Sequence, residues 1–160
     1  QTLRAIDNFP ITGIGLNRYP NVVKYLGVIK KAAAIANYET GKISKEVYEG
    51  IVKACDDVIA GKYNDQFPVD VIQGGAGTST NMNANEVIAN VALECMGHRR
   101  GQYEFCSPND HVNGSQSTND AYPCAVHLAM YADHLEMVKH LDMLIESLEK
   151  KAEEYKNIIT

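Results

Sequence analysis

The residues from about 119 to 158 constrain the fold of this chain most, because apolar residues recur there at alternating steps of three and four. This spacing predicts one long helix with an apolar stripe that packs against other long helices. At ~1.5 Å per residue the helix would be on the order of 55–60 Å long, whereas a globule of this size has a radius of gyration of only about 15 Å. The apolar stripe, irregular at Leu141, consists of Leu128, Tyr131, Leu135, Val138, Leu141, Ile145, Leu148, Ala152, Tyr155 and Ile159.

The rest of the chain is too small to cover the apolar stripe. We therefore expect its partner helices to come from sequence outside this chain or from other subunits. The chain begins at Gln1 rather than at Met, and it ends at Thr160 within the helical pattern. Both ends indicate a piece of a longer protein.

The composition of the chain excludes several classes of protein. With 45% hydrophobic and 22% charged residues it is typical of soluble globular proteins. A net charge of −5 and the lack of a basic cluster argue against nucleic acid as a partner. No apolar run approaches the roughly 20 residues that span a bilayer, and no secretory signal is visible. We expect a cytoplasmic protein with no membrane partner.

The four cysteines show no spacing of the kind that binds zinc, so we expect no metal site. Cys55 and Cys95 fall on apolar helix faces, which predicts buried thiols. Nothing in the pattern requires a disulfide bond.

The remaining sequence predicts a mainly α fold. Residues 1–18 indicate an irregular or short-strand entry segment, and helices are expected at about 21–38, after Ser44, and at about 81–96. Ser44 is expected to cap the second of these helices, and Gly61 to end it. Residues 62–79 and 97–117 are expected to be loops.

Two polar segments carry most of the functional information. The first polar segment is Gly74–Asn85 (GGAGTSTNMNAN), the second is Ser107–Pro123 (SPNDHVNGSQSTNDAYP), and each runs into a predicted helix. A helix start offers unpaired N–H groups and a partial positive charge, and Thr, Ser and Asn side chains add neutral donors. Two such starts predict a pocket for a small molecule that carries a carboxylate.

Each polar segment also has a purely structural explanation. The Thr78–Thr80 run fits a turn followed by a Ser/Thr cap, and it lacks the lysine of a nucleotide-binding P-loop. Ser117 and Asp120 have the spacing of a capping box, and Pro123 is expected in the first turn of the helix. His111, with Asp110 beside it, is expected to make hydrogen bonds within the loop rather than to act as an acid or base.

The strings QGGAGTSTNMNANEVIAN (Gln73–Asn90) and PNDHVNGSQSTNDAYP (Pro108–Pro123) resemble the aspartase/fumarase superfamily. The strings QTLRAIDNFPI, KKAAAIAN and DQFPVDV extend this resemblance over essentially the whole chain. These motifs are long, so they are specific.

Within the superfamily, three positions resemble the aspartases rather than the fumarases. Fumarases typically have Gln-Ser-Asn where this chain has Ser79–Thr80–Asn81, and Ser-Ser-Asn where it has Ser117–Thr118–Asn119. They usually have His where this chain has Ser107. Cys124 departs from the usual Thr, but it lies within the helix and puts little in doubt.

The resemblance implies a helical N-terminal domain over residues 1–118, followed over residues 119–160 by the first long helix of a central helical bundle. It implies a homotetramer that reversibly deaminates L-aspartate to fumarate and ammonia through an aci-carboxylate intermediate, without a cofactor. By the family pattern, Thr78, Ser117 and Thr118 would hold the side-chain carboxylate. Asn119, with Thr78, would hold the amino group.

The catalytic base of the family is a serine in a Gly-Ser-Ser-x-Met-Pro-x-Lys-x-Asn motif, which these 160 residues do not contain. We therefore expect no catalytic residue in this chain, and no turnover by the chain alone. Two alternatives stay open. One is a fumarate hydratase or another lyase of the superfamily, and the other is a non-catalytic helical assembly module in which both polar segments only cap helices.

Overall fold

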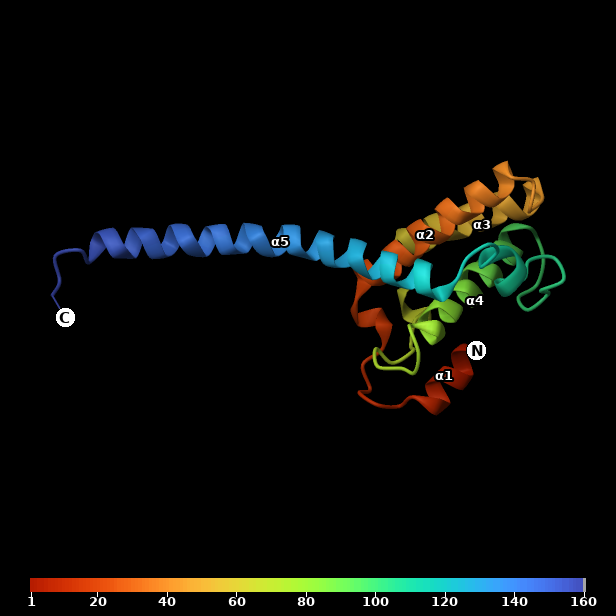
Figure 1. Cartoon of the computed structure of the whole chain (residues 1–160), viewed down its shortest axis with the longest axis horizontal. Helices are drawn as coiled ribbons and strands as arrows, with labels where there is room; N and C mark the ends of the chain where they lie inside the picture. Colours follow the sequence, from red (N-terminus) through yellow and green to blue (C-terminus); the bar gives the residue numbers. More distant parts are fainter. Residues whose placement is uncertain (160) are drawn as a thin grey trace. The chain divides into compact units, whose positions relative to one another are not determined.

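The computed structural model describes residues 1–159, and these fold mainly into helices (Figure 1). The α-helices are α1 (Thr2–Asn8), α2 (Pro20–Glu39), α3 (Lys45–Ile59), α4 (Thr78–Cys95) and α5 (Thr118–Glu154). Shorter turns are η1 (Leu16–Arg18), η2 (Asn64–Gln66) and the π-helical η3 (Pro108–Val112). The described residues form no strand beyond one isolated antiparallel bridge, between Gly15 and Asp70. The predicted mainly α class is confirmed.

The contacts divide the chain into two compact units, residues 1–129 and the residues from Met130 onward. The first unit contains α1 to α4 and the first turns of α5, so both polar segments lie within it. The second unit holds the rest of α5. The predicted domain boundary, between residues 1–118 and residues 119–160, stays a prediction.

The core of the first unit is built by α2, α3 and α4. Helices α2 and α3 lie side by side, joined by a short turn (Figure 1), and α3 also packs against α4. Leu26 of α2, Ile51 of α3 and Ile88 of α4 are completely buried. The predicted cap of α3 is confirmed, because the side chain of Ser44 accepts a hydrogen bond from the N–H of Val47 at 3.3 Å.

The expected irregular or strand-like entry segment was wrong in part, because residues 2–8 form α1. Tertiary contacts stabilise this short helix. Its Ala5 is buried, and Glu86 of α4 accepts hydrogen bonds from the N–H and the hydroxyl of Thr2 at 3.0 and 2.6 Å. A helix of seven residues depends on such partners, since short helices are marginal on their own.

Helix α4 begins at Thr78, three residues before the expected start, and no Ser or Thr side chain caps it. Gly77 takes the cap position with φ +84°, and the cap acceptor is Gln73. The Gln73 Oε1 atom accepts from the N–H of Thr80 at 2.8 Å, and its Nε2 atom donates to Thr80 Oγ1 at 2.6 Å. Therefore a residue seven positions upstream replaces the expected Ser/Thr cap.

Helix α5 contains 37 residues and ends at Glu154 rather than near residue 158. Pro123 lies inside this helix as its sixth residue, not in its first turn as expected, because the helix begins at Thr118. Since proline has no N–H, Pro123 cannot donate to the carbonyl oxygen of Asn119. In the second unit the apolar stripe is exposed, for example 64% at Tyr131 and 61% at Leu148.

Cys55 is buried as expected, whereas Cys95 is only partly buried because it is the last residue of α4, at the edge of the core. Burial raises the pKa of the Cys55 thiol to about 12, so this thiol stays protonated and inert. Within residues 1–159 no group of His, Cys, Asp and Glu side chains is arranged to hold a metal ion. No helix among these residues has the length and apolar character needed to cross a membrane.

Candidate functional site

The start of α5 is a formed capping box, as the spacing of Ser117 and Asp120 predicted. The Ser117 N–H donates to both carboxylate oxygens of Asp120, at 3.2 and 3.1 Å. In return, Ser117 Oγ accepts from the N–H of Asn119 at 3.1 Å. Because the Ser117 oxygen accepts a hydrogen bond within the protein, its exposed hydroxyl keeps a proton to donate to a ligand.

A hydrogen bond joins the starts of α4 and α5. The Nδ2 atom of Asn81, in the first turns of α4, donates to Thr118 Oγ1 at 3.3 Å. Tyr122 reinforces this junction, since a Cβ atom added at Gly77 would lie 2.2 Å from the Cδ1 atom of its ring. Only glycine fits there, so the two polar segments meet closely.

The four residues predicted to bind substrate all lie at these two helix starts. Thr78 is the first residue of α4, and Thr118 is the first residue of α5, with Ser117 before it and Asn119 after it. Thr78, Ser117 and Asn119 are exposed, whereas Thr118 is half-buried. Among the described residues, Thr118 is the one of the four whose side chain forms a hydrogen bond with α4. The ligand roles of all four stay predictions.

A cavity of about 450 Å³ lies beside this junction, between residues 71–77 and residues 122–127. None of the four predicted residues lines it. Its polar lining includes Gln73, Tyr122 and His127, and the rest is mostly apolar or backbone. The arrangement of donors at the two helix starts therefore does not coincide with this cavity.

His111 makes hydrogen bonds within its loop, as predicted. Its Nδ1 atom accepts from the N–H of Ser107 at 2.9 Å. The Ser107 hydroxyl donates to Asp110 Oδ2 at 2.8 Å and accepts from the Asp110 N–H at 3.1 Å. These bonds hold the η3 turn together.

The sequence interpretation missed a buried polar network under the start of α5. The side chain of Lys30 has no exposed surface, and its Nζ atom donates to Asn113 Oδ1 at 2.9 Å and to Gln116 Oε1 at 3.0 Å. Asn113 Oδ1 also accepts from the Nδ2 atoms of Asn81 and Asn85, at 3.0 and 3.2 Å. We call these five residues together with Thr118 the lysine network.

One signal in the sequence pointed to Lys30. The buried residues of α2 recur at steps of three and four, and Lys30 falls on this stripe together with Leu26 and Ala34. A lysine on the buried stripe of a helix requires polar partners from elsewhere in the chain. Gln116 and Asn113, in the second polar segment, are those partners.

Burial lowers the pKa of Lys30 from 10.5 to about 8, while Cys55 and Asp120 act in the opposite direction. The ammonium group is therefore still charged at neutral pH. It places a buried positive charge beneath the start of α5, where the N–H groups of a helix start already favour an anion.

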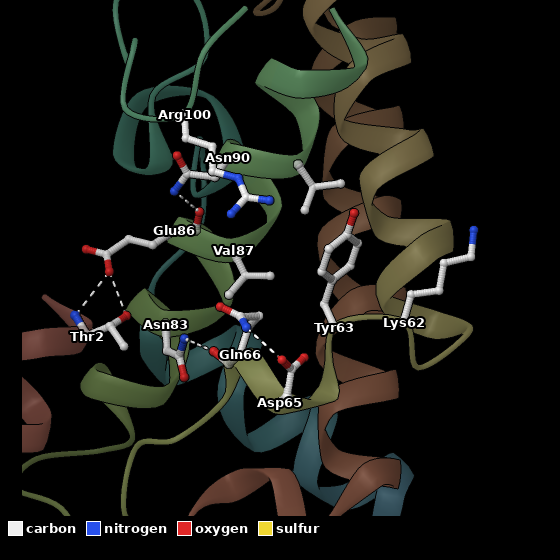
Figure 2. Close-up of a pocket in the computed structure, with 11 residues that line it drawn as sticks. Thr2, Lys62, Tyr63, Asp65, Gln66, Asn83, Glu86, Val87, Asn90 and Arg100 are labelled. Atoms are coloured by element: carbon white, nitrogen blue, oxygen red, sulfur yellow. Dashed lines mark hydrogen bonds between the residues drawn. The ribbon is translucent and has the colours of Figure 1, made fainter.

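A second cavity, of about 460 Å³, lies on another side of α4 (Figure 2). Figure 2 shows Thr2 bonded to Glu86, and Asn83 turned toward Gln66, whose carbonyl accepts from Asn83 Nδ2 at 2.9 Å. Arg100, also at this cavity, forms an ion pair with Glu94. No predicted site residue lines this cavity.

The chain matches known proteins over its full length. The profile of a lyase family matches residues 1–160. The aspartate ammonia-lyase of Bacillus sp is 55% identical over 159 residues, and that of Escherichia coli (strain K12) is 51% identical. Each alignment covers 99% of this chain, but only 34% and 33% of those relatives. The chain therefore spans about a third of the length of the curated relatives it matches.

Solved structures give the same result. The native fumarate lyase:delta crystallin of Brucella melitensis has a TM-score of 0.94 and 51% identity, covering 98% of this chain and 36% of that one. The class II fumarase of Schistosoma mansoni has a TM-score of 0.72 and 39% identity, covering 80% of this chain and 27% of that one. The fold is that of the helical aspartase/fumarase superfamily, and the chain belongs to the lyase family.

Proposed function

We propose that this chain is the N-terminal part of an aspartate ammonia-lyase, which reversibly converts L-aspartate to fumarate and ammonia. The observation that carries the proposal is the junction of two hydroxyl-bearing helix starts, made by Asn81 and Thr118. The identities of 55% and 51% to curated aspartate ammonia-lyases support the choice of substrate.

The chemistry of the reaction fits donors of this kind. Elimination removes a proton from the carbon beside the side-chain carboxylate of aspartate, which is a weak carbon acid. Negative charge then builds on that carboxylate, in an aci-carboxylate intermediate. Neutral donors that are already aimed at the developing charge stabilise it without binding the ground state as a full ion pair.

Each predicted residue then has a role. Thr78, Ser117 and Thr118 donate hydrogen bonds to the side-chain carboxylate, and Asn119, with Thr78, holds the amino group. The hydroxyl oxygens of Ser117 and Thr118 already accept from protein N–H groups, so their protons are available for the carboxylate. The base that takes the proton is supplied by sequence outside these residues, so the isolated chain has no turnover.

We further propose that the complete protein is a cytoplasmic homotetramer. The exposed apolar stripe of α5 supports an assembly through long helices. Residues from neighbouring subunits would then complete each site.

A second candidate is a fumarate hydratase, favoured by the likeness to the fumarase of Schistosoma mansoni. The identity to that enzyme is 39%, below the values for the aspartate ammonia-lyases.

Turnover by the complete protein tests the proposal. We expect fumarate to form from L-aspartate, measured by its ultraviolet absorbance, and no comparable formation from L-malate. The 160-residue chain, assayed alone at the same concentration, serves as the control and should be inactive. Turnover of malate without turnover of aspartate would select the fumarase alternative. Sustained turnover by the 160-residue chain alone would refute the proposal that catalysis needs residues from outside this chain.

A further inference from the structure

The most unusual buried group in the first unit is the ammonium of Lys30. A buried cation is costly unless hydrogen bonds or opposite charges compensate it. Among the described residues, its hydrogen bonds go to the side-chain amide oxygens of Asn113 and Gln116, not to a carboxylate. The cost of burying this charge therefore suggests a role beyond packing.

The hydrogen bonds of the lysine network have a fixed direction from donor to acceptor, and Lys30 sets it. An ammonium group only donates hydrogen bonds, so Asn113 must present its oxygen to Lys30. The same oxygen also faces Asn81, which must therefore present its Nδ2 atom. The second proton of that Nδ2 atom goes to Thr118 Oγ1.

This direction decides what the Thr118 hydroxyl does. Because Thr118 Oγ1 accepts from Asn81, the hydroxyl proton is left to donate in another direction. If Asn113 and Asn81 were reversed, the Asn81 oxygen would face Thr118 and would take that proton. Lys30 excludes this reversed arrangement, since an amide NH₂ group would then face the ammonium.

We propose that Lys30 is a positioning residue of the carboxylate site, which acts through Asn113 and Asn81 to keep the Thr118 hydroxyl as a donor. The inference rests on the proposed function, because that function places the substrate carboxylate at Thr118. The positive charge of Lys30 also offsets the carboxylate of Asp120, which otherwise makes the start of α5 less favourable for a dianion.

A double-mutant cycle in the complete protein tests the inference. The variants are Lys30→Met, Thr118→Val and the double variant, and the measurements are kcat/KM for L-aspartate and the Kd of succinate. Each single variant should lower kcat/KM by about 10²-fold, the size of effect seen when one such donor is lost. The kcat/KM of the double variant should lie within about threefold of that of the less active single variant, because both changes remove the same donor.

Effects that multiply in the double variant would overturn the inference, since Lys30 would then act independently of Thr118. A Lys30→Met variant that keeps kcat/KM within about threefold of the unmutated protein would also overturn it.

Two asparagines on α4 provide a matched control that does not depend on Lys30→Met folding. Asn81 and Asn83 are both 1% exposed, but Asn83 donates to the carbonyl of Gln66 and lies outside the lysine network. Asn81→Ala should lower kcat/KM by at least about 10-fold. Its effect on the activation free energy should not add to that of Thr118→Val when the two changes are combined. Asn83→Ala should change kcat/KM by less than about threefold. Equal losses would mean general damage to α4 and would contradict the inference.

The succinate measurement separates this inference from the proposed function. If the unmutated protein binds succinate but does not turn over aspartate, the proposed function fails, and the cycle in Kd still decides the inference. Non-additive effects of Lys30→Met and Thr118→Val on the Kd of succinate then support the positioning role of Lys30, and additive effects overturn it. Absence of both turnover and succinate binding would overturn both proposals.

Discussion

The carboxylate of Asp70 joins the entry segment to the residues before the first polar segment. Its Oδ2 atom accepts from the N–H groups of Thr12 and Gly13 at 2.7 and 2.9 Å. Its Oδ1 atom accepts from the Thr12 hydroxyl and from the N–H of Ile72, both at 2.8 Å. Burial raises the pKa of Asp70, but these hydrogen bonds outweigh burial and lower the pKa from 3.8 to about 2.

Because the folded state lowers the pKa of Asp70, its stabilising contribution is present above about pH 3.8 and is lost as the pH falls through about 2. Asp70→Asn should lower the melting temperature of the complete protein at neutral pH by about 5 °C, since an amide NH₂ would face N–H donors. The difference from the unmutated protein should shrink between these two pH values.

Asp65→Asn is the matched control, since Asp65 is exposed and accepts from the neighbouring Gln66 side chain. It should change the melting temperature little at any pH. A difference in melting temperature between Asp70→Asn and the unmutated protein that stays constant down to pH 2 would contradict the lowered pKa of Asp70.

The sequence predicted interactions between residues that are near in the chain better than interactions between distant ones. The box of Ser117 and Asp120 was predicted because both partners lie within one helical turn. The bonds of Lys30 to Asn113 and Gln116 were not predicted, because those partners lie 83 and 86 positions away. Only packing of the helices brings such residues together.

The ring of Tyr122 in α5 packs against Gly77 at the start of α4, where a Cβ atom would have no room. The left-handed backbone at Gly77 both begins α4 and lets the aromatic ring of α5 approach. This contact holds the two helix starts at a separation that the bond from Asn81 to Thr118 can span.

Gly77→Ala should therefore lower the melting temperature of the complete protein more than Gly97→Ala does. Gly97 has a similar φ of +81°, but a Cβ atom there meets nothing within 4 Å. Gly97→Ala thus isolates the cost of the left-handed backbone, ~1 kcal/mol. Gly77→Ala also displaces the ring of Tyr122, so we expect it to lower the melting temperature at least about twice as much as Gly97→Ala does. It should also weaken the binding of succinate. Equal losses for the two variants would show that the contact with Tyr122 has no energetic role.

The helices themselves were largely predictable, whereas their starts were less so. The apolar spacing predicted α2, α3 and α5 to within a few residues. The start of α4 was placed too late, because its cap comes from Gln73 in the preceding loop. Residues 2–8 were not recognised as a helix, since Glu86 of α4 stabilises it.

The apolar stripe of α5 is the longest run of large apolar side chains that the described residues leave exposed. Within the second unit, Tyr131, Leu141 and Leu148 are 64, 46 and 61% exposed. Exposed apolar residues at this spacing are typical of helices that associate with other helices. The homotetramer remains a proposal, supported by the exposed stripe.

Leu148→Lys in the complete protein should weaken that assembly, because it places a charge within the apolar stripe. We expect a lower mean mass in sedimentation at micromolar concentration. Ser147→Lys adds the same charge at a neighbouring exposed position off the stripe. The mean mass of this variant in sedimentation should equal that of the unmutated protein. The same mass for Leu148→Lys and the unmutated protein would argue against association through the stripe.

The proposed function requires that hydroxyls at two helix starts receive a substrate carboxylate. A crystal structure of the complete protein with bound succinate would show whether they do. We expect one succinate carboxylate to accept hydrogen bonds from Thr78 Oγ1 at the start of α4 and from Ser117 Oγ and Thr118 Oγ1 at the start of α5, at about 2.5–3.0 Å. Succinate bound at another place, with these hydroxyls directed away from it, would contradict the proposed function.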